Sequence, residues 1–135
     1  MNPVLIDTAV WIQYLRKGDD AASEKLVELL KNEQVCTNGI VIAELFSGAK
    51  NEKDKKLLNN ILRPIPYLTT TRVIWRQSGE FKFLLLTKGH SIPLPDAIIA
   101  ATAVHYGVEL FSMDIHFSII AKYIPLKLMP CAIDC

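Results

Sequence analysis

Four long stretches of this sequence each contain one charged residue, and in every case that residue is an acid. The stretches are residues 1–15, 34–49, 89–108 and 110–121, and their acids are Asp7, Glu44, Asp96 and Asp114. Stretches this poor in charge form the interior of a folded domain, because burying an unpaired charge is costly. The fold must therefore accommodate four carboxylates in apolar surroundings that offer no basic partner nearby in the sequence.

Short apolar runs and helical patterns alternate along the chain. Strands are predicted at 1–6, 34–37 and 109–111, and helices from Asp7, over 20–32, after Asn38 to Gly48, over 71–88, over 96–106 and from Ile115. A strongly charged segment over 50–63 ends at Pro64, and a last apolar run covers 124–129. This alternation predicts an α/β domain with a mostly parallel sheet between helices, and in such folds sites form at the carboxyl ends of the strands.

Length and composition fit one soluble domain. Because a chain of this length buries about two thirds of its unfolded surface, we expect a single domain over residues 1–135. No apolar run approaches the roughly 20 residues of a bilayer crossing, and no basic region precedes the first apolar run, so we expect a cytoplasmic protein with no membrane partner. Cys36, Cys131 and Cys135 form no CxxC pair and are expected to be reduced thiols. The net charge of +1 gives no overall sign of nucleic-acid binding and leaves a local basic patch open.

Each acid allows two interpretations. Asp7, Asp96 and Asp114 all lie where a helix is predicted to begin, and an aspartate N-cap is worth about 1 kcal/mol, so capping alone explains any one of them. Glu44 lies inside an apolar helical pattern, where there is no helix start to cap. If the acids cluster, each like-charge pair at about 4 Å costs on the order of 4 kcal/mol at an effective dielectric of about 20. A cation would offset that cost, and Mg²⁺ and Mn²⁺ prefer carboxylate oxygens.

The four acids and their neighbours resemble a PIN domain, and more narrowly the toxin ribonucleases of the VapC type. The matching segments are Leu5-Ile6-Asp7-Thr8, Ala43-Glu44-Leu45, the run from Pro95 to Ala103, and Ser112-Met113-Asp114 with Phe117 after it. No single motif is specific, but the order and spacing of all four acids agree over nearly the whole chain. The resemblance implies a PIN-like three-layer α/β/α sandwich with a short, mostly parallel central sheet.

The resemblance also implies a function, namely a metal-dependent endoribonuclease. Such an enzyme cuts structured RNA with Mg²⁺ or Mn²⁺, forms a homodimer and is inhibited by a co-expressed antitoxin. On this interpretation the catalytic residues and metal ligands are Asp7, Glu44, Asp96 and Asp114, with Asp7 and Asp96 nearest to the metal. The hydroxyls of Thr8 and Ser112 would orient the carboxylates or waters around them.

An RNA substrate needs basic residues around the acidic centre, because phosphate contacts supply most sequence-independent affinity. The candidates are Arg16, Lys17, Lys50, Lys53, Arg72, Arg76 and Lys82, and a solvated helix face is the ordinary alternative for each. His116 stands where the family often has a further aspartate, which puts a fifth acidic ligand in doubt and makes this residue a candidate phosphate contact. Thr8 stands where asparagine or serine is frequent and keeps a hydroxyl. Trp11, Tyr14 and Trp75 fall at helical spacing and are expected to be core or dimer contacts.

Two other functions are weighed against this one. Phosphoryl-aspartate chemistry also starts from a strand-end acid such as Asp7, but Ala9 stands where that chemistry needs a second acid. A PIN-like protein-binding module without catalytic activity would have no need of the four acids, and all four are present.

Overall fold

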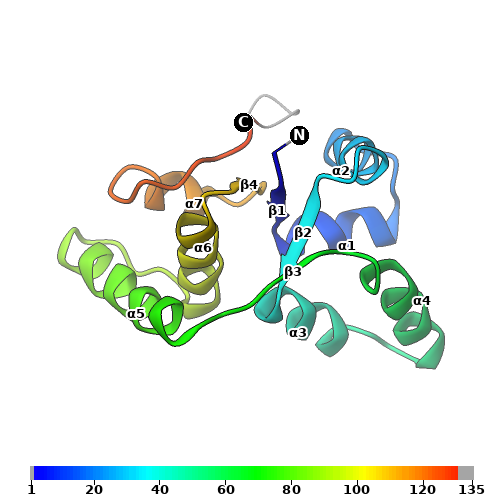
Figure 1. Cartoon of the computed structure of the whole chain (residues 1–135), viewed down its shortest axis with the longest axis horizontal. Helices are drawn as coiled ribbons and strands as arrows, with labels where there is room; N and C mark the ends of the chain where they lie inside the picture. The colour runs from blue at the N-terminus through cyan, green and yellow to red at the C-terminus, as the bar shows by residue number, and fades with distance from the viewer. Residues whose placement is uncertain (1, 131–135) are drawn as a thin grey trace.

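A sheet of four parallel strands runs through the middle of the molecule (Figure 1). The computed structural model describes residues 2–130. The strands are β1 (Val4–Ile6), β2 (Val35–Asn38), β3 (Tyr67–Leu68) and β4 (Glu109–Phe111), and their order across the sheet is β3-β2-β1-β4. Val4 lies opposite Val35 on one side and Glu109 on the other, so β1 is flanked by two neighbours. The parallel sheet expected from the sequence is confirmed.

Helices cover both faces of this sheet. In chain order they are α1 (Thr8–Arg16), α2 (Ala21–Lys31), α3 (Gly39–Ser47), α4 (Glu52–Leu62), α5 (Arg72–Thr87), α6 (Leu94–Tyr106) and α7 (Ile115–Ile120). Figure 1 shows α1, α2 and α4 on one side of the sheet and α5, α6 and α7 on the other. This arrangement confirms the three-layer α/β/α sandwich.

Side-chain caps start several of the helices. The Asp7 carboxylate accepts a hydrogen bond from the Thr8 N–H at the start of α1, and the Asn38 side chain accepts one from the Val41 N–H at the start of α3. Asp114 accepts one from the His116 N–H at the start of α7. Each of these bonds satisfies a backbone donor that the first helical turn leaves free. The caps that the sequence predicts at Asp7 and Asp114 are therefore confirmed, and Asn38, the residue before the helix predicted up to Gly48, caps α3.

The start of α6 differs from the prediction. The helix begins at Leu94 rather than at Asp96, with Pro93 at the N-cap and Pro95 in the first turn. Proline suits the first turn because its fixed φ is helical and its missing N–H would have no partner there. Asp96 consequently lies inside the helix and does not cap it, so the capping explanation is wrong for this residue.

Two segments extend the sheet beyond the predicted strands. The short strand β3, which follows Pro66, pairs with Thr37 and Asn38 of β2 at one edge and was not predicted. At the other edge the last apolar run lies along β4, where the Leu110 N–H donates to the Lys127 carbonyl at 2.8 Å and the Met129 N–H donates to the Leu110 carbonyl at 2.8 Å. Both edges of the short sheet are thus partly covered.

The core is built from β1 and the helix faces that pack on it. Val4, Leu5 and Ile6 are fully buried, and the Trp11 ring is buried as expected, whereas Trp75 is exposed and is not a core residue. Cys36 is a buried free thiol, while Cys131 and Cys135 lie outside the described residues. Within residues 2–130, no helix combines the length and apolarity that crossing a membrane requires.

Candidate metal centre

Two of the four acids leave the sheet at the same edge. Asp7 follows β1 directly, and Asp114 follows β4 by three residues. Because Ile6 lies opposite Phe111 in parallel strands, the two chain segments emerge side by side, and the Asp7 N–H donates to the Phe111 carbonyl at 3.0 Å. The expectation that the site forms at the carboxyl ends of the strands agrees with this geometry.

Asp7 is the most deeply buried of the acids, with 5% of its surface exposed. One carboxylate oxygen accepts from the Thr8 N–H at 2.8 Å, and the other accepts from the Ser112 hydroxyl at 2.8 Å. The Ser112 hydroxyl in turn accepts from the Asp114 N–H at 3.0 Å, so it connects the two acids. Burial raises the pKa of Asp7 to about 6, and the negative charge of Asp96 adds to the rise, while the Ser112 hydrogen bond opposes it.

Glu44 is joined to this group through Thr8. It lies in the middle of α3, and its Oε1 accepts from the Thr8 hydroxyl at 2.7 Å. Thr8 therefore contacts two acids, Asp7 through its backbone N–H and Glu44 through its side chain. The charge of Glu44 also contributes to raising the pKa of Asp96, which places the two carboxylates within electrostatic reach of each other.

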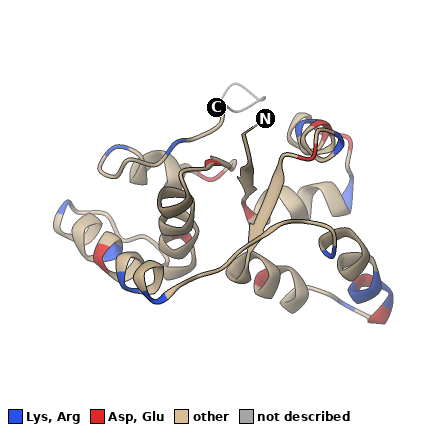
Figure 2. Cartoon of the chain, viewed as in Figure 1, with Lys and Arg blue, Asp and Glu red and all other residues tan. Residues whose placement is uncertain are grey.

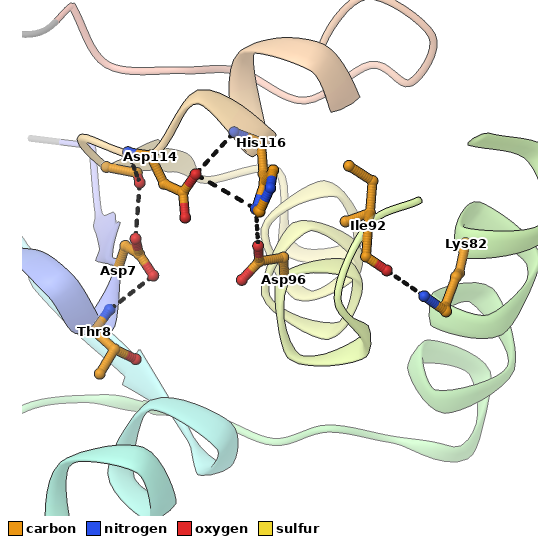
Figure 3. Close-up of polar contacts among 8 residues, drawn as sticks. Asp7, Thr8, Lys82, Ile92, Asp96, Asp114 and His116 are labelled. Atoms are coloured by element: carbon orange, nitrogen blue, oxygen red, sulfur yellow. Dashed lines mark hydrogen bonds and ion pairs between the residues drawn. The ribbon is translucent and has the colours of Figure 1, made fainter. Parts of the chain in front are cut away.

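Among the described residues, Asp96, Asp114 and His116 form a close group of potential metal ligands. One donor atom from each lies within 4.8 Å of the other two. The His116 Nδ1 lies 2.9 Å from Asp96 Oδ2 and 3.4 Å from Asp114 Oδ1, and Figure 3 shows the ring between the two carboxylates. Burial raises the pKa of Asp96, the hydrogen bond from His116 opposes that rise, and the charge of Asp114 adds to it.

The sequence interpretation takes Asp7 and Asp96 as the residues nearest to a metal, and that assignment stays a prediction. In the structure, donor atoms of Asp96, Asp114 and His116 lie close together, and Asp7 is linked to Asp114 through Ser112. The ring of His116, a candidate phosphate contact in the sequence, faces Asp96 and Asp114 and is partly exposed. Two sequence signals agree with that orientation: its place two residues after a helix-capping aspartate, and its match to a position where the resembled family often has a further aspartate.

The basic residues predicted to surround the centre are distributed unevenly. Arg16 and Lys50 line a pocket of about 300 Å³ that also contains Glu44 and apolar side chains such as Leu15 and Leu57. The pocket lies between α1, α3 and α4, and its lining also includes Asp54, so it brings two basic and two acidic side chains to one side of the acidic centre. Figure 2 shows many of the other lysines and arginines on outer segments, including α4 and α5.

Arg72 and Arg76 lie far from the acids in this chain. Both are near the start of α5, which is held against the end of α6 by a hydrogen bond from the Tyr106 hydroxyl to the Thr69 carbonyl at 2.6 Å. Asp96 is at the opposite end of α6, ten residues earlier, which corresponds to about 15 Å along a helix. The Arg76 side chain is 84% exposed and pairs with Glu80.

Lys82 does not contact the acids either. Its ammonium donates to the Ile92 carbonyl in the segment that leads into α6, as Figure 3 shows. Across residues 2–130, no lysine or arginine forms an ion pair with any of the four acids. Only His116 does so in this part of the chain.

The donor set fits a hard divalent cation. It offers several carboxylate oxygens at one edge of the sheet, and burial raises the pKa values of two of the acids, Asp7 and Asp96, because it disfavours their charged forms. Mg²⁺ and Mn²⁺ bind such oxygens and would supply the missing charge. A cation held by carboxylates can also activate a bound water, and this is how metal ions assist the hydrolysis of phosphate esters.

Comparison with known proteins points to the same chemistry. The PIN domain family matches residues 4–123. Ribonuclease VapC32 of Mycobacterium tuberculosis is 37% identical over 114 residues, which cover 82% of this chain and 84% of the relative. Ribonuclease VapC11 of the same organism is 25% identical over 128 residues, or 92% of this chain and 96% of the relative. Among solved structures, VapBC2 from Rickettsia felis bound to a promoter DNA fragment superposes with a TM-score of 0.76 and 25% identity, over 93% of this chain and 96% of that one.

Proposed function

The chain belongs to the PIN domain family and, within it, to the VapC ribonucleases, and from this premise we propose that its four acids bind the cation with which it hydrolyses RNA phosphodiester bonds. The observation that carries the proposal is the convergence of Asp7, Glu44, Asp96 and Asp114 on one place without a lysine or arginine partner among the described residues. A bound Mg²⁺ or Mn²⁺ lowers the pKa of a water and offsets charge on the phosphodiester.

The protein residues divide the remaining work. Asp96 and Asp114 supply carboxylate oxygens at the open side of the group, where their side chains are 16% and 37% exposed. Asp7 is held from both sides by Thr8 and Ser112, so its carboxylate is fixed before any substrate binds. Prior fixation of charged groups is the main contribution that a protein makes to this type of hydrolysis, because no reorganisation is needed during the reaction.

The pocket beside Glu44 is the best approach for an RNA strand. Arg16 and Lys50 on its wall can neutralise phosphates next to the acids, while the remote Arg72 and Arg76 cannot reach the same strand at the centre of this chain. We therefore assign phosphate binding to Arg16 first. Replacing Arg16 with glutamine should weaken RNA binding and reduce its salt dependence by about one phosphate contact.

An antitoxin is proposed as the protein partner. The solved structure named above is a VapBC complex, and the pocket here combines apolar side chains with an opening next to Glu44. A segment of the antitoxin that fills this pocket would block the approach of RNA to the acids. Copurification of the tagged chain with the product of the neighbouring reading frame tests this, and Leu57→Glu should weaken the complex because Leu57 is a half-exposed side chain of the pocket.

A homodimer is proposed from one face of α5. Trp75, Phe83 and Leu86 follow helical spacing along this face and are 54%, 71% and 61% exposed. Gly79 lies between them, and a Cβ at that position would meet nothing within 4 Å. No side chain therefore projects from the middle of this face. Exposed apolar stripes of this kind mark protein contacts.

The decisive experiment combines RNA cleavage with metal-dependent stability. Purified protein should cut structured RNA in Mg²⁺ or Mn²⁺ and not in EDTA, and Mn²⁺ should raise the melting temperature, because a ligand at about 100 times its Kd stabilises by about 2.7 kcal/mol. Asp96→Asn should abolish both effects. Asp19→Asn, which changes an exposed acid outside the site, is the matched control and should abolish neither.

Other outcomes would point elsewhere. If Mn²⁺ leaves the stability unchanged at millimolar concentration and RNA stays intact, the chain is a protein-binding module built on a PIN scaffold. If Mn²⁺ stabilises the wild type and RNA stays intact, the metal site stands and the assigned reaction is wrong.

A further inference from the structure

Among residues 2–130, His116 is the one histidine that faces the acidic group, where it contacts Asp96 and Asp114. Its Nδ1 is directed at Asp96 Oδ2, at 2.9 Å, and at Asp114 Oδ1, at 3.4 Å. The other two histidines lie elsewhere. His90 faces Tyr123, and His105 is an exposed residue near the end of α6 that stacks edge-on with Tyr106.

The local fold holds the imidazole in this position. His116 lies in the first turn of α7, where its N–H donates to Asp114 Oδ1 at 2.9 Å. Ile115 before it is exposed and Phe117 after it is buried, so α7 can turn only one face toward the core. With Phe117 anchored, the His116 ring is directed along the acidic edge rather than into solvent, and 36% of the side chain remains exposed.

The spacing of the donor atoms agrees with neighbouring positions around one cation. In an octahedral site with metal–ligand distances of about 2.1 Å, adjacent donors are about 3.0 Å apart. The two separations from Nδ1, 2.9 and 3.4 Å, are close to that value. A single hydrogen bond to Asp96 would account for the first distance, but it would not require the same nitrogen to face Asp114.

An imidazole changes which cation such a site selects. Carboxylate oxygens and water suit Mg²⁺ and Mn²⁺ alike, whereas nitrogen donors favour first-row transition metals. A site that contains only acids therefore has no strong reason to distinguish Mn²⁺ from Mg²⁺. A site with one imidazole ligand should favour Mn²⁺ over Mg²⁺.

We propose that His116 Nδ1 is a direct ligand of the divalent cation, together with Asp96 and Asp114, and that this mixed nitrogen and oxygen site prefers Mn²⁺ to Mg²⁺. The inference rests on the proposed metal-dependent function and adds to it the identity of one ligand and the preferred ion. Asp7 and Glu44 hold the side of the site that faces the sheet and α3.

The test is the electron spin echo envelope modulation of Mn²⁺ bound to the whole 135-residue chain, in the absence of RNA. Bound Mn²⁺ should show modulation from an imidazole nitrogen, and labelling the protein with ¹⁵N-histidine should change that modulation. His116→Asp should remove it, while His105→Asn, the matched control, should keep it. In parallel, the ratio of the Mg²⁺ and Mn²⁺ dissociation constants should fall by at least about tenfold in His116→Asp, since even outer hydrogen-bonding partners alter metal affinity by 10- to 100-fold.

Each result separates this inference from the proposed function. If Mn²⁺ binds, Asp96→Asn abolishes binding and no histidine nitrogen couples to the ion, His116 only orients Asp96 and the inference is wrong, while the metal-dependent function stands. If the wild type binds no Mn²⁺ at all, both fail. An unchanged Mg²⁺ to Mn²⁺ ratio in His116→Asp would also overturn the proposed ion preference.

Discussion

Replacing Asp7 with asparagine should stabilise the protein when no metal is present. The Asp7 carboxylate is almost fully buried, and its pKa is raised from 3.8 to about 6. A carboxyl group with a raised pKa in the folded state costs stability once the pH exceeds its ordinary pKa, because the unfolded chain ionises it more easily. The cost is absent below about pH 4, increases up to pH 6 and is complete above pH 6.

The size of the effect follows from the pKa difference. A rise of about two units corresponds to about 3 kcal/mol at pH 8. Asparagine is nearly isosteric, and its oxygen can still accept from the Thr8 N–H while its nitrogen donates to the Ser112 hydroxyl. Rearranging the Ser112 hydrogen bonds should cost about 1 kcal/mol, which leaves a net gain of about 2 kcal/mol for Asp7→Asn.

Urea unfolding in EDTA at pH 8 and at pH 4 measures this gain. Asp7→Asn should exceed the wild type by about 2 kcal/mol at pH 8 and should lose that advantage at pH 4. Asp19→Asn, at an exposed position, should match the wild type at both pH values. An Asp7→Asn variant that is less stable than the wild type at pH 8, or whose gain is the same at both pH values, would show that burial of this carboxylate is not the cause.

Further substitutions test three other parts of the structure. Thr8→Val removes the 2.7 Å bond to Glu44 and should lower Mn²⁺ affinity and RNA cleavage about tenfold, whereas Thr8→Ser should restore both. Asn38→Leu removes a buried cap of α3 and should lower the free energy of unfolding by about 2 kcal/mol in urea titrations. Asn51→Ala removes an exposed helix cap and should lower the free energy of unfolding by about 1 kcal/mol or less. Phe83→Asp should give a monomer in sedimentation experiments with unchanged unfolding, and a persistent dimer would exclude the α5 face as the interface.

The distribution of charge along the sequence predicted that the four acids would lie together. Burying an unpaired charge is costly, and lone acids in charge-poor stretches are visible in the sequence itself. A lone acid in an apolar stretch has to find compensation from another part of the chain, and strand-end positions indicate where Asp7 and Asp114 emerge. Glu44, which cannot cap a helix, was the informative residue. The contact that joins it to the others, through the Thr8 hydroxyl, agrees with that reasoning.

The details that the sequence did not reveal depend on tertiary packing. Asp96 was expected to be an N-cap, but Pro93 and Pro95 shift the start of α6 two residues earlier. The ring of His116 faces the acids only because burial of Phe117 fixes the rotation of α7. The distance between Arg72 and the acids depends on how α5 packs against α6, which no local pattern specifies.

Helix starts explain where Asp7, Asp96 and Asp114 lie, but the helix dipoles do not balance the charge of these acids. Asp7 and Asp114 cap α1 and α7, and Asp96 lies in the first turn of α6, so three helix N-termini face the centre. An exposed helix N-terminus stabilises a carboxylate by about 0.3–1 kcal/mol, which would lower its pKa. The pKa values of Asp7 and Asp96 are raised instead, and for Asp7 the rise corresponds to about 3 kcal/mol. Desolvation and mutual repulsion thus outweigh the helix dipoles, and the remaining imbalance is what a divalent cation would offset.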